Sequence, residues 1–137
     1  MRYAPDAHEI QTVETLSDAE RMEYFLIRIA ETEEVWSLLE RQNIFRHEVN
    51  GQWVVPFWPY RHFARTAALE QWQDGAPQGM SLEHFIHPTL QQLIDADLLV
   101  EIMPTADRPG CLITPHRLLD ILVSMQHARE YRLDAAG

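Results

Sequence analysis

The chain of 137 residues contains no lysine. All 11 basic residues are arginine, so a lysine Schiff base or a lysine general base is excluded. Cysteine is almost as scarce: Cys111 stands alone, which excludes an internal disulfide framework and is typical of a reducing cytosol. No run of about 18 apolar residues occurs, so the sequence predicts no membrane span. The N-terminus lacks the apolar core of a secretory signal, and we therefore expect a cytoplasmic protein.

Basic charge is also in short supply. The 11 arginines stand against 21 acidic residues, which gives a formal net charge of −10. Because contacts to phosphate need clustered cations, we expect no nucleic-acid partner. The shortage is uneven. Residues 41–72 hold 4 arginines and 2 acidic residues, whereas residues 1–40 hold 3 arginines and 10 acidic residues. The middle of the chain is thus a basic, aromatic-rich segment in an acidic protein.

The length and the apolar content of 46% suffice for one hydrophobic core. We predict a single domain over residues 1–137, in which residues 1–16 form a loosely attached N-terminal arm or a short helix. The stretch SDAE at Ser17–Glu20 is a capping box, and the apolar residues behind it recur at helical spacing. This pattern predicts an amphipathic helix that ends near Thr32.

Two residues that favour a tight turn, Asn50 and Gly51, separate the predicted strands Ile44–Val49 and Gln52–Phe57. This arrangement predicts a hairpin with a type I′ turn. Other patterns predict strands over 35–39, 98–103 and 111–113 and a loop over 73–79. They also predict helices over 59–72, over 81–94 with a break or kink at Pro88, and from 115 onward. The order αβββααββα predicts an α+β fold, in which a mostly antiparallel sheet of about five strands carries helices on one face.

The stretch VPFWPYRHFA contains a sharp corner. Because a residue before proline avoids the helical region, we expect Trp58 at the N-cap and Pro59 as the first residue of a helix. The first turn carries no acidic residue, so its amides need water, an internal acid or a bound anion. With water or an internal acid the corner is purely structural. With an anion it is the site of a small-molecule binder or an enzyme, formed by Trp58, Tyr60, Arg61, His62 and Arg65.

No other pattern in the sequence points to catalysis. The 7 histidines are scattered without an H-E-x-x-H motif, and there is no cysteine cluster. Cys111 and His116 lie five residues apart, but a small buried hydrophobe is the commoner role of such a cysteine. The sequence therefore predicts no metal, no cofactor and no catalytic residue, and it favours a non-enzymatic protein without deciding the point.

Two surface features are candidates for a partner interface. Acidic residues crowd the C-terminal end of the first long helix, where the helix dipole disfavours them, so they form either solvated surface or a face for a basic partner. Two apolar residues of the last helix lie off its core stripe and are covered either by the N-terminal arm or by a second copy in a homodimer. The residues concerned are Glu31, Glu33, Glu34, Leu119 and Val123.

These features give a leading hypothesis and an alternative. The leading one is a non-enzymatic protein-binding module, for example an inhibitor or immunity-type protein that covers a basic partner. The alternative is a small-molecule or anion site at the Trp58–Pro59 corner with Arg61 and Arg65.

The stretches MEYFLIRIAETEEVWSLL and VPFWPYRHFARTAALEQW resemble an uncharacterised bacterial family, domain of unknown function 2750. The resemblance extends from Glu20 to Leu122, and one departure is ERQNIFRHEVNG, which is longer or more basic than the family pattern. It implies a small cytoplasmic bacterial protein and carries no activity, substrate or site. The matching residues are Tyr24, Phe25, Leu26, Val35, Trp36, Leu38, Pro56, Trp58 and Pro59.

Overall fold

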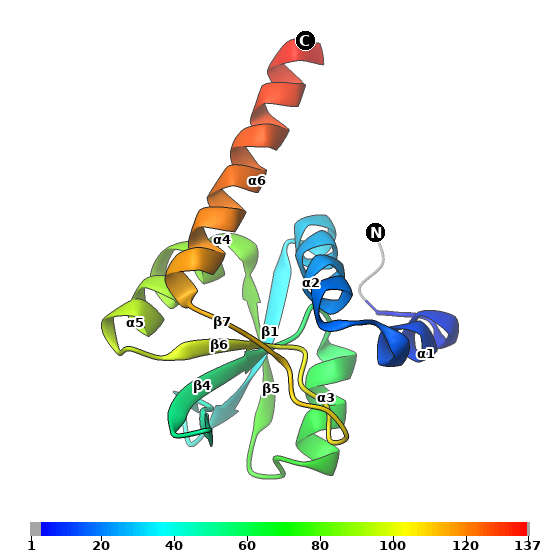
Figure 1. Cartoon of the computed structure of the whole chain (residues 1–137), viewed down its shortest axis with the longest axis vertical. Coiled ribbons are helices and arrows are strands. Elements are labelled where there is room, and N and C mark those ends of the chain that lie inside the picture. Colours follow the sequence, from blue (N-terminus) through cyan, green and yellow to red (C-terminus); the bar gives the residue numbers. More distant parts are fainter. Residues whose placement is uncertain (1–3, 137) are drawn as a thin grey trace.

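The structure, a computed structural model, describes the backbone of residues 4–136 and the side chains of residues 4–130. It confirms the predicted α+β fold (Figure 1). The helices are α1 (Ala7–Thr15), α2 (Asp18–Thr32), α3 (Arg61–Glu70), α4 (Leu82–His84), the π-helix η1 (Phe85–Thr89), α5 (Leu90–Asp95) and α6 (Pro115–Ala136). The strands are β1 (Glu34–Glu40), β2 (Asn43–Ile44), β3 (His47–Val49), β4 (Gln52–Phe57), β5 (Ala76–Ser81), β6 (Leu99–Ile102) and β7 (Cys111–Ile113).

The strands form two sheets, where we had expected one. The three-stranded sheet has the order β2-β1-β5, and the four-stranded sheet has the order β3-β4-β6-β7. Neighbouring strands are antiparallel except β4 and β6, which are parallel because a long crossover separates them. Trp36 and Trp58 join the sheets, since each backbone N–H donates to the other's carbonyl at 2.8 Å. Figure 1 shows α3 on one side of β1 and β5, with α4 and α5 on the other.

The predicted hairpin turn is confirmed. Asn50 and Gly51 have φ angles of 51° and 82°, the positive values that a type I′ turn requires. The strand before the turn differs from the prediction, because it is split into β2, which pairs with β1, and β3, which pairs with β4. At the split Phe45 is buried, and its N–H donates to the carbonyl of Leu38 at 2.8 Å. The chain therefore passes from one sheet to the other at this residue.

Strand β5 replaces part of the loop that we predicted over residues 73–79. Its glycine and proline lower the intrinsic strand propensity, but pairing with the buried strand β1 along its whole length outweighs that preference. Gly79 is needed in this strand because a Cβ there would lie 2.9 Å from Cζ2 of Trp36. The small residue that resembles a loop signal in sequence thus makes room for a tryptophan.

Two helix predictions have different outcomes. The capping box is confirmed: the N–H of Ser17 donates to Glu20 at 2.9 Å, and the N–H of Glu20 donates to Oγ of Ser17 at 3.2 Å. Of the break or kink predicted at Pro88, the break does not occur, because the helix changes to the π-helix η1, which carries this proline and leads directly into α5. The wider π-helical turn accommodates a residue that lacks an N–H and crowds the preceding turn.

Helix α1 gives the N-terminal arm a defined structure from Ala7 onward, whereas residues 1–3 lie outside the described residues. Val13 of α1 is buried in the core, and the carboxylate of Glu9 makes polar contacts with α2. The hydroxyl of Tyr24 donates to Oε2 of Glu9 at 2.5 Å, and Nε of Arg28 donates to the same oxygen at 3.1 Å. Burial and the bond to Glu9 raise the pKa of Tyr24.

Helix α6 begins at Pro115, as predicted, and extends beyond the body of the protein (Figure 1). Leu118 and Leu122 are buried, whereas residues 126–130 are exposed. Among the described residues, neither α6 nor another helix is long and apolar enough to cross a membrane.

Candidate functional site

The corner at Trp58 is a structural junction. The side chain is 1% exposed, and its Nε1–H donates to the carbonyl of Pro104 at 3.0 Å. Since the backbone of Trp58 also pairs with Trp36, this residue ties both sheets to the corner loop, which we define as residues 103–108.

Helix α3 begins two residues later than predicted. Tyr60, not Trp58, is the N-cap, and Arg61, not Pro59, is the first helical residue. Tyr60 is buried and its backbone is extended (φ −135°, ψ 148°), so the packing of this side chain delays the helix. The N-cap side chain makes no capping hydrogen bond within the described part of the chain.

The structure separates the five residues of the predicted anion site. Trp58 and His62 line a pocket of about 400 Å³ between α1, α3 and the corner loop, which we call the corner pocket. Of the residues described, Tyr60 is buried beneath α3, and Arg61 and Arg65 are exposed on a face of α3 outside the pocket. The lining from α3 follows helical spacing; it comprises His62, Phe63, Thr66, Ala67 and Glu70.

One side chain that lines the corner pocket is an almost fully buried cation. Arg21 of α2 is 2% exposed and donates through Nη1 to the carbonyl of Met103 and through Nη2 to the carbonyl of Pro109, both at 2.9 Å. A third bond joins Nη2 to Asp18 at 2.9 Å. The buried Nε–H has no hydrogen-bond partner among the described residues. A buried unpaired donor is costly, by about 1–3 kcal/mol, and therefore calls for a partner.

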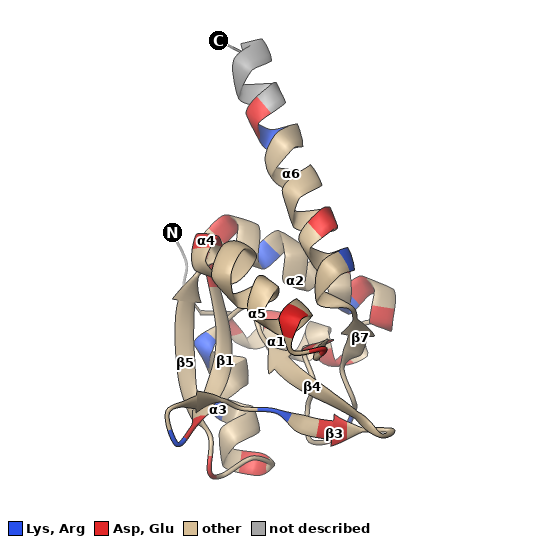
Figure 2. Ribbon diagram, turned by 90° about the vertical axis from the view of Figure 1, so that its left-hand side faces the viewer, with Lys and Arg blue, Asp and Glu red and all other residues tan. Residues whose placement is uncertain are grey.

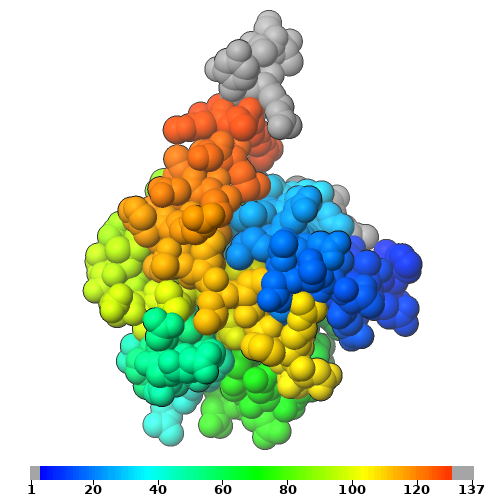
Figure 3. Space-filling view, in the orientation of Figure 1, coloured from blue at the N-terminus to red at the C-terminus, as the bar shows by residue number. Residues whose placement is uncertain are grey.

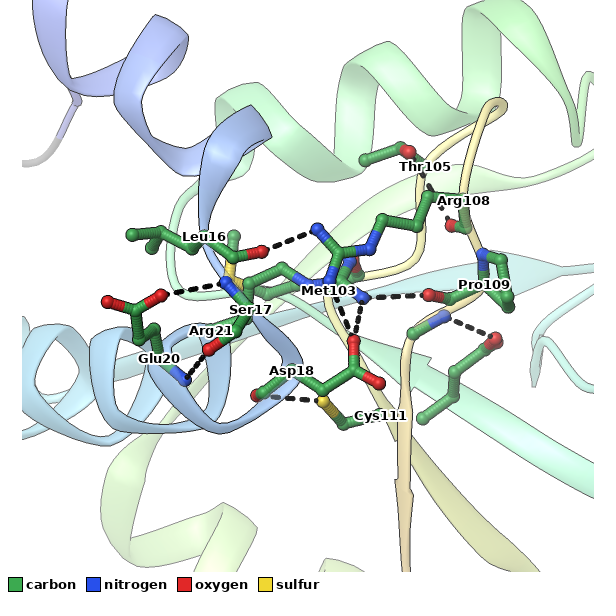
Figure 4. A network of polar contacts seen from close by, with 12 residues as sticks. Leu16, Ser17, Asp18, Glu20, Arg21, Met103, Thr105, Arg108, Pro109 and Cys111 are labelled. Carbon is green, nitrogen blue, oxygen red and sulfur yellow. Dashed lines mark hydrogen bonds and ion pairs between the residues drawn. The ribbon is translucent and has the colours of Figure 1, made fainter.

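A second arginine fixes the corner loop in place. Arg108 donates through Nη1 to the carbonyl of Leu16 at 2.5 Å and through Nη2 to Asp18 at 2.8 Å (Figure 4). Asp18 thus accepts from two guanidinium groups, and these hydrogen bonds, with Arg21 first, lower the pKa of its carboxyl group. Figure 3 shows the corner loop in yellow against the blue residues of α1 and α2.

The corner loop leaves β6 through a strained residue. Met103 is 2% exposed and has φ 55°, a left-handed conformation that is uncommon for residues other than glycine. Its N–H donates to the carbonyl of Phe57 at 3.0 Å, and its carbonyl accepts from Arg21. Strained backbone that the surrounding contacts hold in place occurs often at binding sites.

The sequence contains a signal for Arg21 that we missed. The buried positions Arg21, Phe25 and Ile29 of α2 follow one another at intervals of four, and Met22 packs against the core beside them. An arginine in phase with a buried apolar stripe must reach polar partners from inside the protein. Arg108 gave no comparable signal, because its partners lie 90 residues or more away in the chain.

The residues predicted to bind a partner are not among those that line the corner pocket. Glu31 pairs with Arg28, and Glu33 is the exposed C-cap of α2 in a left-handed conformation. Glu34 starts β1 opposite Ser81. On α6, Leu119 packs against the core and Val123 is half-buried.

A buried acid lies outside the corner pocket. Glu101 of β6 is 1% exposed, and its Oε1 lies 2.6 Å from Nε2 of His47, while its Oε2 accepts from the N–H of Gly110 at 3.1 Å. The ring of His47 packs on Phe45 and Trp72. Within the described residues, no group of three or more His, Cys, Asp or Glu side chains is arranged to hold a metal ion.

A comparison with curated proteins finds no match. A family model described as "Protein of unknown function (DUF2750)" matches residues 22–122, which include β1, the Trp58 corner, α3 and the corner loop. The chain therefore belongs to the DUF2750 family, as the motifs around Trp36 and Trp58 indicated.

Proposed function

We propose that this chain binds a small organic carboxylate in the corner pocket. The observation that carries the proposal is Arg21, a buried cation that lines the pocket and whose Nε–H has no partner among the described residues. A carboxylate oxygen is the partner that a guanidinium group accommodates best, because both groups are planar and their charges are opposite.

The dimensions and the apolar surface of the corner pocket support a small-molecule ligand. Its volume of about 400 Å³ falls within the range of typical ligand sites. Ile10 and Val13 of α1 face Phe63 of α3 across it, which provides apolar walls for the body of a ligand. A ligand that fills such a pocket gains affinity from burial as well as from the ion pair.

The charges around the corner pocket favour a singly charged ligand. Arg21 and Arg108 supply positive charge, but Glu14, Glu70 and Asp107 also line the pocket. Three carboxylates disfavour a phosphate with two negative charges and favour a monocarboxylate that carries hydroxyl or amino donors. The proposal therefore replaces the α3 start, with Arg61 and Arg65, by Arg21 as the centre of recognition.

The proposal is tested with small monocarboxylates, hydroxy acids and amino acids as probes, with inorganic phosphate and matched chloride as controls. A ligand at about 100 times its Kd stabilises the folded chain by about 2.7 kcal/mol, which a thermal unfolding scan detects. In a ¹⁵N NMR spectrum of the arginine side chains, the Nε–H signal of Arg21 should shift, because the ligand becomes its partner.

Two variants make this test specific. Ala106→Trp places a large side chain at the pocket lining from an exposed loop position, and we expect it to abolish the response. Arg61→Ala removes an exposed arginine that lies outside the pocket, so its response should equal that of the wild type. A panel in which no carboxylate stabilises the wild type, or in which Ala106→Trp responds equally, contradicts the proposal.

A further inference from the structure

Strand β5 forms an edge of its sheet, and its outward side has no partner strand among the described residues. The register with β1 shows which backbone groups point outward. The N–H of Leu82 donates to the carbonyl of Glu33 at 2.8 Å, and hydrogen-bonded pairs alternate along an antiparallel ladder. Met80 and Gln78 therefore bond toward β1, while the backbone N–H groups of Gly79 and Ser81 point away from it.

The backbone of Trp36 confirms this assignment. Trp36 is the register partner of Gly79, and its own N–H and C=O bond to Trp58 on the opposite side of β1. The backbone of Pro77 also points outward. Because proline has no N–H, the open edge lacks one donor at this position, while the hydrogen bonds between β5 and β1 are unaffected. Two consecutive outward positions, Gly79 and Ser81, thus offer N–H donors to an added strand.

The edge of β5 has little protection against pairing. Natural edge strands are commonly blocked by charged side chains, but residues 75–82 contain none. In Figure 2, β5 lies at the left margin of the fold and its ribbon carries no charge colour. Pro77 blocks one position at the start of the strand, and Nε2 of Gln78 donates to the carbonyl of Gly79 at 3.0 Å. The backbone N–H groups of Gly79 and Ser81 remain open.

A groove runs beside this edge. It has a volume of about 750 Å³ and lies between the β1–β5 face and the helical segment η1–α5, and we call it the edge groove. Residues 78–81 of β5 line it, so the open backbone and the groove are continuous. The lining is neutral apart from His84; its apolar members are Leu38, Leu39, Ile44, Gly79, Met80, Leu93, Ala96 and Leu98.

Acidic residues gather at the Ser81 end of the edge. Glu34 is the register partner of Ser81, Glu33 accepts the backbone N–H of Leu82, and Glu83 follows on α4. Three acids from two segments distant in sequence therefore border one end of β5. The opposite end of the strand, at Ala76, follows Asp74 and Gly75.

We propose that the β5 edge docks an extended peptide segment of a partner protein. The segment adds a strand to the β2-β1-β5 sheet through backbone hydrogen bonds to Gly79 and Ser81, and its uncharged side chains fill the edge groove. An arginine or lysine of the segment lies beside Glu33, Glu34 and Glu83. A second copy of this chain fits less well, because its own β5 segment has no basic residue for these acids.

The experiment is a selection of random peptides of ~10 residues against the full chain, followed by synthesis of the enriched sequence. We expect alternating uncharged side chains with a basic residue toward one end. On binding, the amide signals of Gly79 and Ser81 should shift, and their hydrogen exchange should slow because outward N–H groups become bonded. N-methylation of the peptide at the paired positions should abolish binding.

Two matched variants locate the site. Gln78→Lys places a charge on the open edge and should weaken the peptide by about tenfold or more, which corresponds to about 1.4 kcal/mol. Gln73→Lys adds the same charge at an exposed position before the strand and should leave affinity unchanged. Glu83→Gln should weaken peptides that carry the basic residue, whereas Glu23→Gln on α2 should not.

Three outcomes overturn the proposal. Enriched peptides that bind equally to Gln78→Lys occupy another surface. A selection without enrichment shows that the edge is not a peptide site. Self-association of the full chain in light scattering that Gln78→Lys abolishes identifies a second copy, not a partner segment, as the occupant.

Discussion

Replacing the buried Arg21 by methionine is the perturbation whose cost the structure defines most fully. Methionine approximates the aliphatic part of the side chain but removes the hydrogen bonds to the carbonyls of Met103 and Pro109. Hydrogen bonds of charged donors are worth about 1.5–3 kcal/mol each. The substitution also removes the unpaired Nε–H, whose burial costs the wild type about 1–3 kcal/mol. The two effects together predict a net loss of about 2–3 kcal/mol in the free energy of unfolding.

The comparison with other buried ion pairs makes this prediction informative. Buried charge clusters can often be replaced by apolar residues without loss of stability, because all polar partners leave together. Two of the three partners of Arg21 are backbone carbonyls, which no substitution of a side chain removes, and the third is the exposed carboxylate of Asp18. We therefore expect Arg21→Met to lower the stability, whereas the joint replacement of both side chains in an isolated buried ion pair is often neutral.

Urea unfolding followed by tryptophan fluorescence measures the effect, and a thermal scan should show a decrease in Tm of about 8–12 °C. Arg108→Met is the matched control. The Arg108 side chain is 35% exposed, and its bond to the exposed Asp18 is screened by water, so we expect a loss of about 1 kcal/mol. An Arg21→Met variant that is as stable as the wild type would refute the argument that the two carbonyls depend on this guanidinium group.

Three further predictions concern other buried polar groups. Trp58→Phe keeps an aromatic ring but loses the bond to the corner loop, so it should cost about 1–2 kcal/mol, against about 3–5 kcal/mol for Trp58→Ala, in the same unfolding assay. His47→Ala leaves the carboxylate of Glu101 buried with one backbone N–H and should cost about 2–3 kcal/mol; a neutral result would show that His47 is dispensable. Because the pKa of Tyr24 is raised, the fold favours the neutral phenol, and stability is complete below the ordinary value of about 10 and falls as the pH rises above it. Unfolding curves between about pH 8 and pH 11 should show this fall in the wild type and a smaller one in Tyr24→Phe.

Local chemistry in the sequence determined those parts of the fold that depend on neighbouring residues. The capping box of α2 and the Asn50–Gly51 turn were predicted because each needs a few residues in a fixed order. The boundaries that failed depend on contacts between distant segments. Strand β5 exists because β1 is buried beside it, and the start of α3 moves because Tyr60 is packed into the core.

The residues that line the corner pocket could be predicted only in part, for the same reason. The corner itself was visible in the sequence, since two prolines flank Phe57 and Trp58. The positively charged groups at the corner pocket were not visible in the sequence, because Arg21 reaches the pocket from α2 and Arg108 from the corner loop. Arg61 and Arg65 are adjacent to Trp58 in the chain, but on a helix they lie one turn apart on the exposed face. Proximity in sequence therefore selected Arg61 and Arg65, whereas the arginines that line the corner pocket are Arg21 and Arg108.

Helix α1 links the corner pocket to the family match. The match begins at residue 22, so α3 and the corner loop lie inside the matched region and α1 lies before it. Yet α1 supplies one wall of the pocket, and the contacts of Glu9 with Tyr24 and Arg28 hold that wall against α2. An ionised Tyr24 would repel Glu9, so the alkaline loss of stability predicted above acts first on this attachment. The pocket is therefore not a property of the family region alone: its closure depends on a helix that the half-buried phenol of Tyr24 and the guanidinium group of Arg28 both contact through the carboxylate of Glu9.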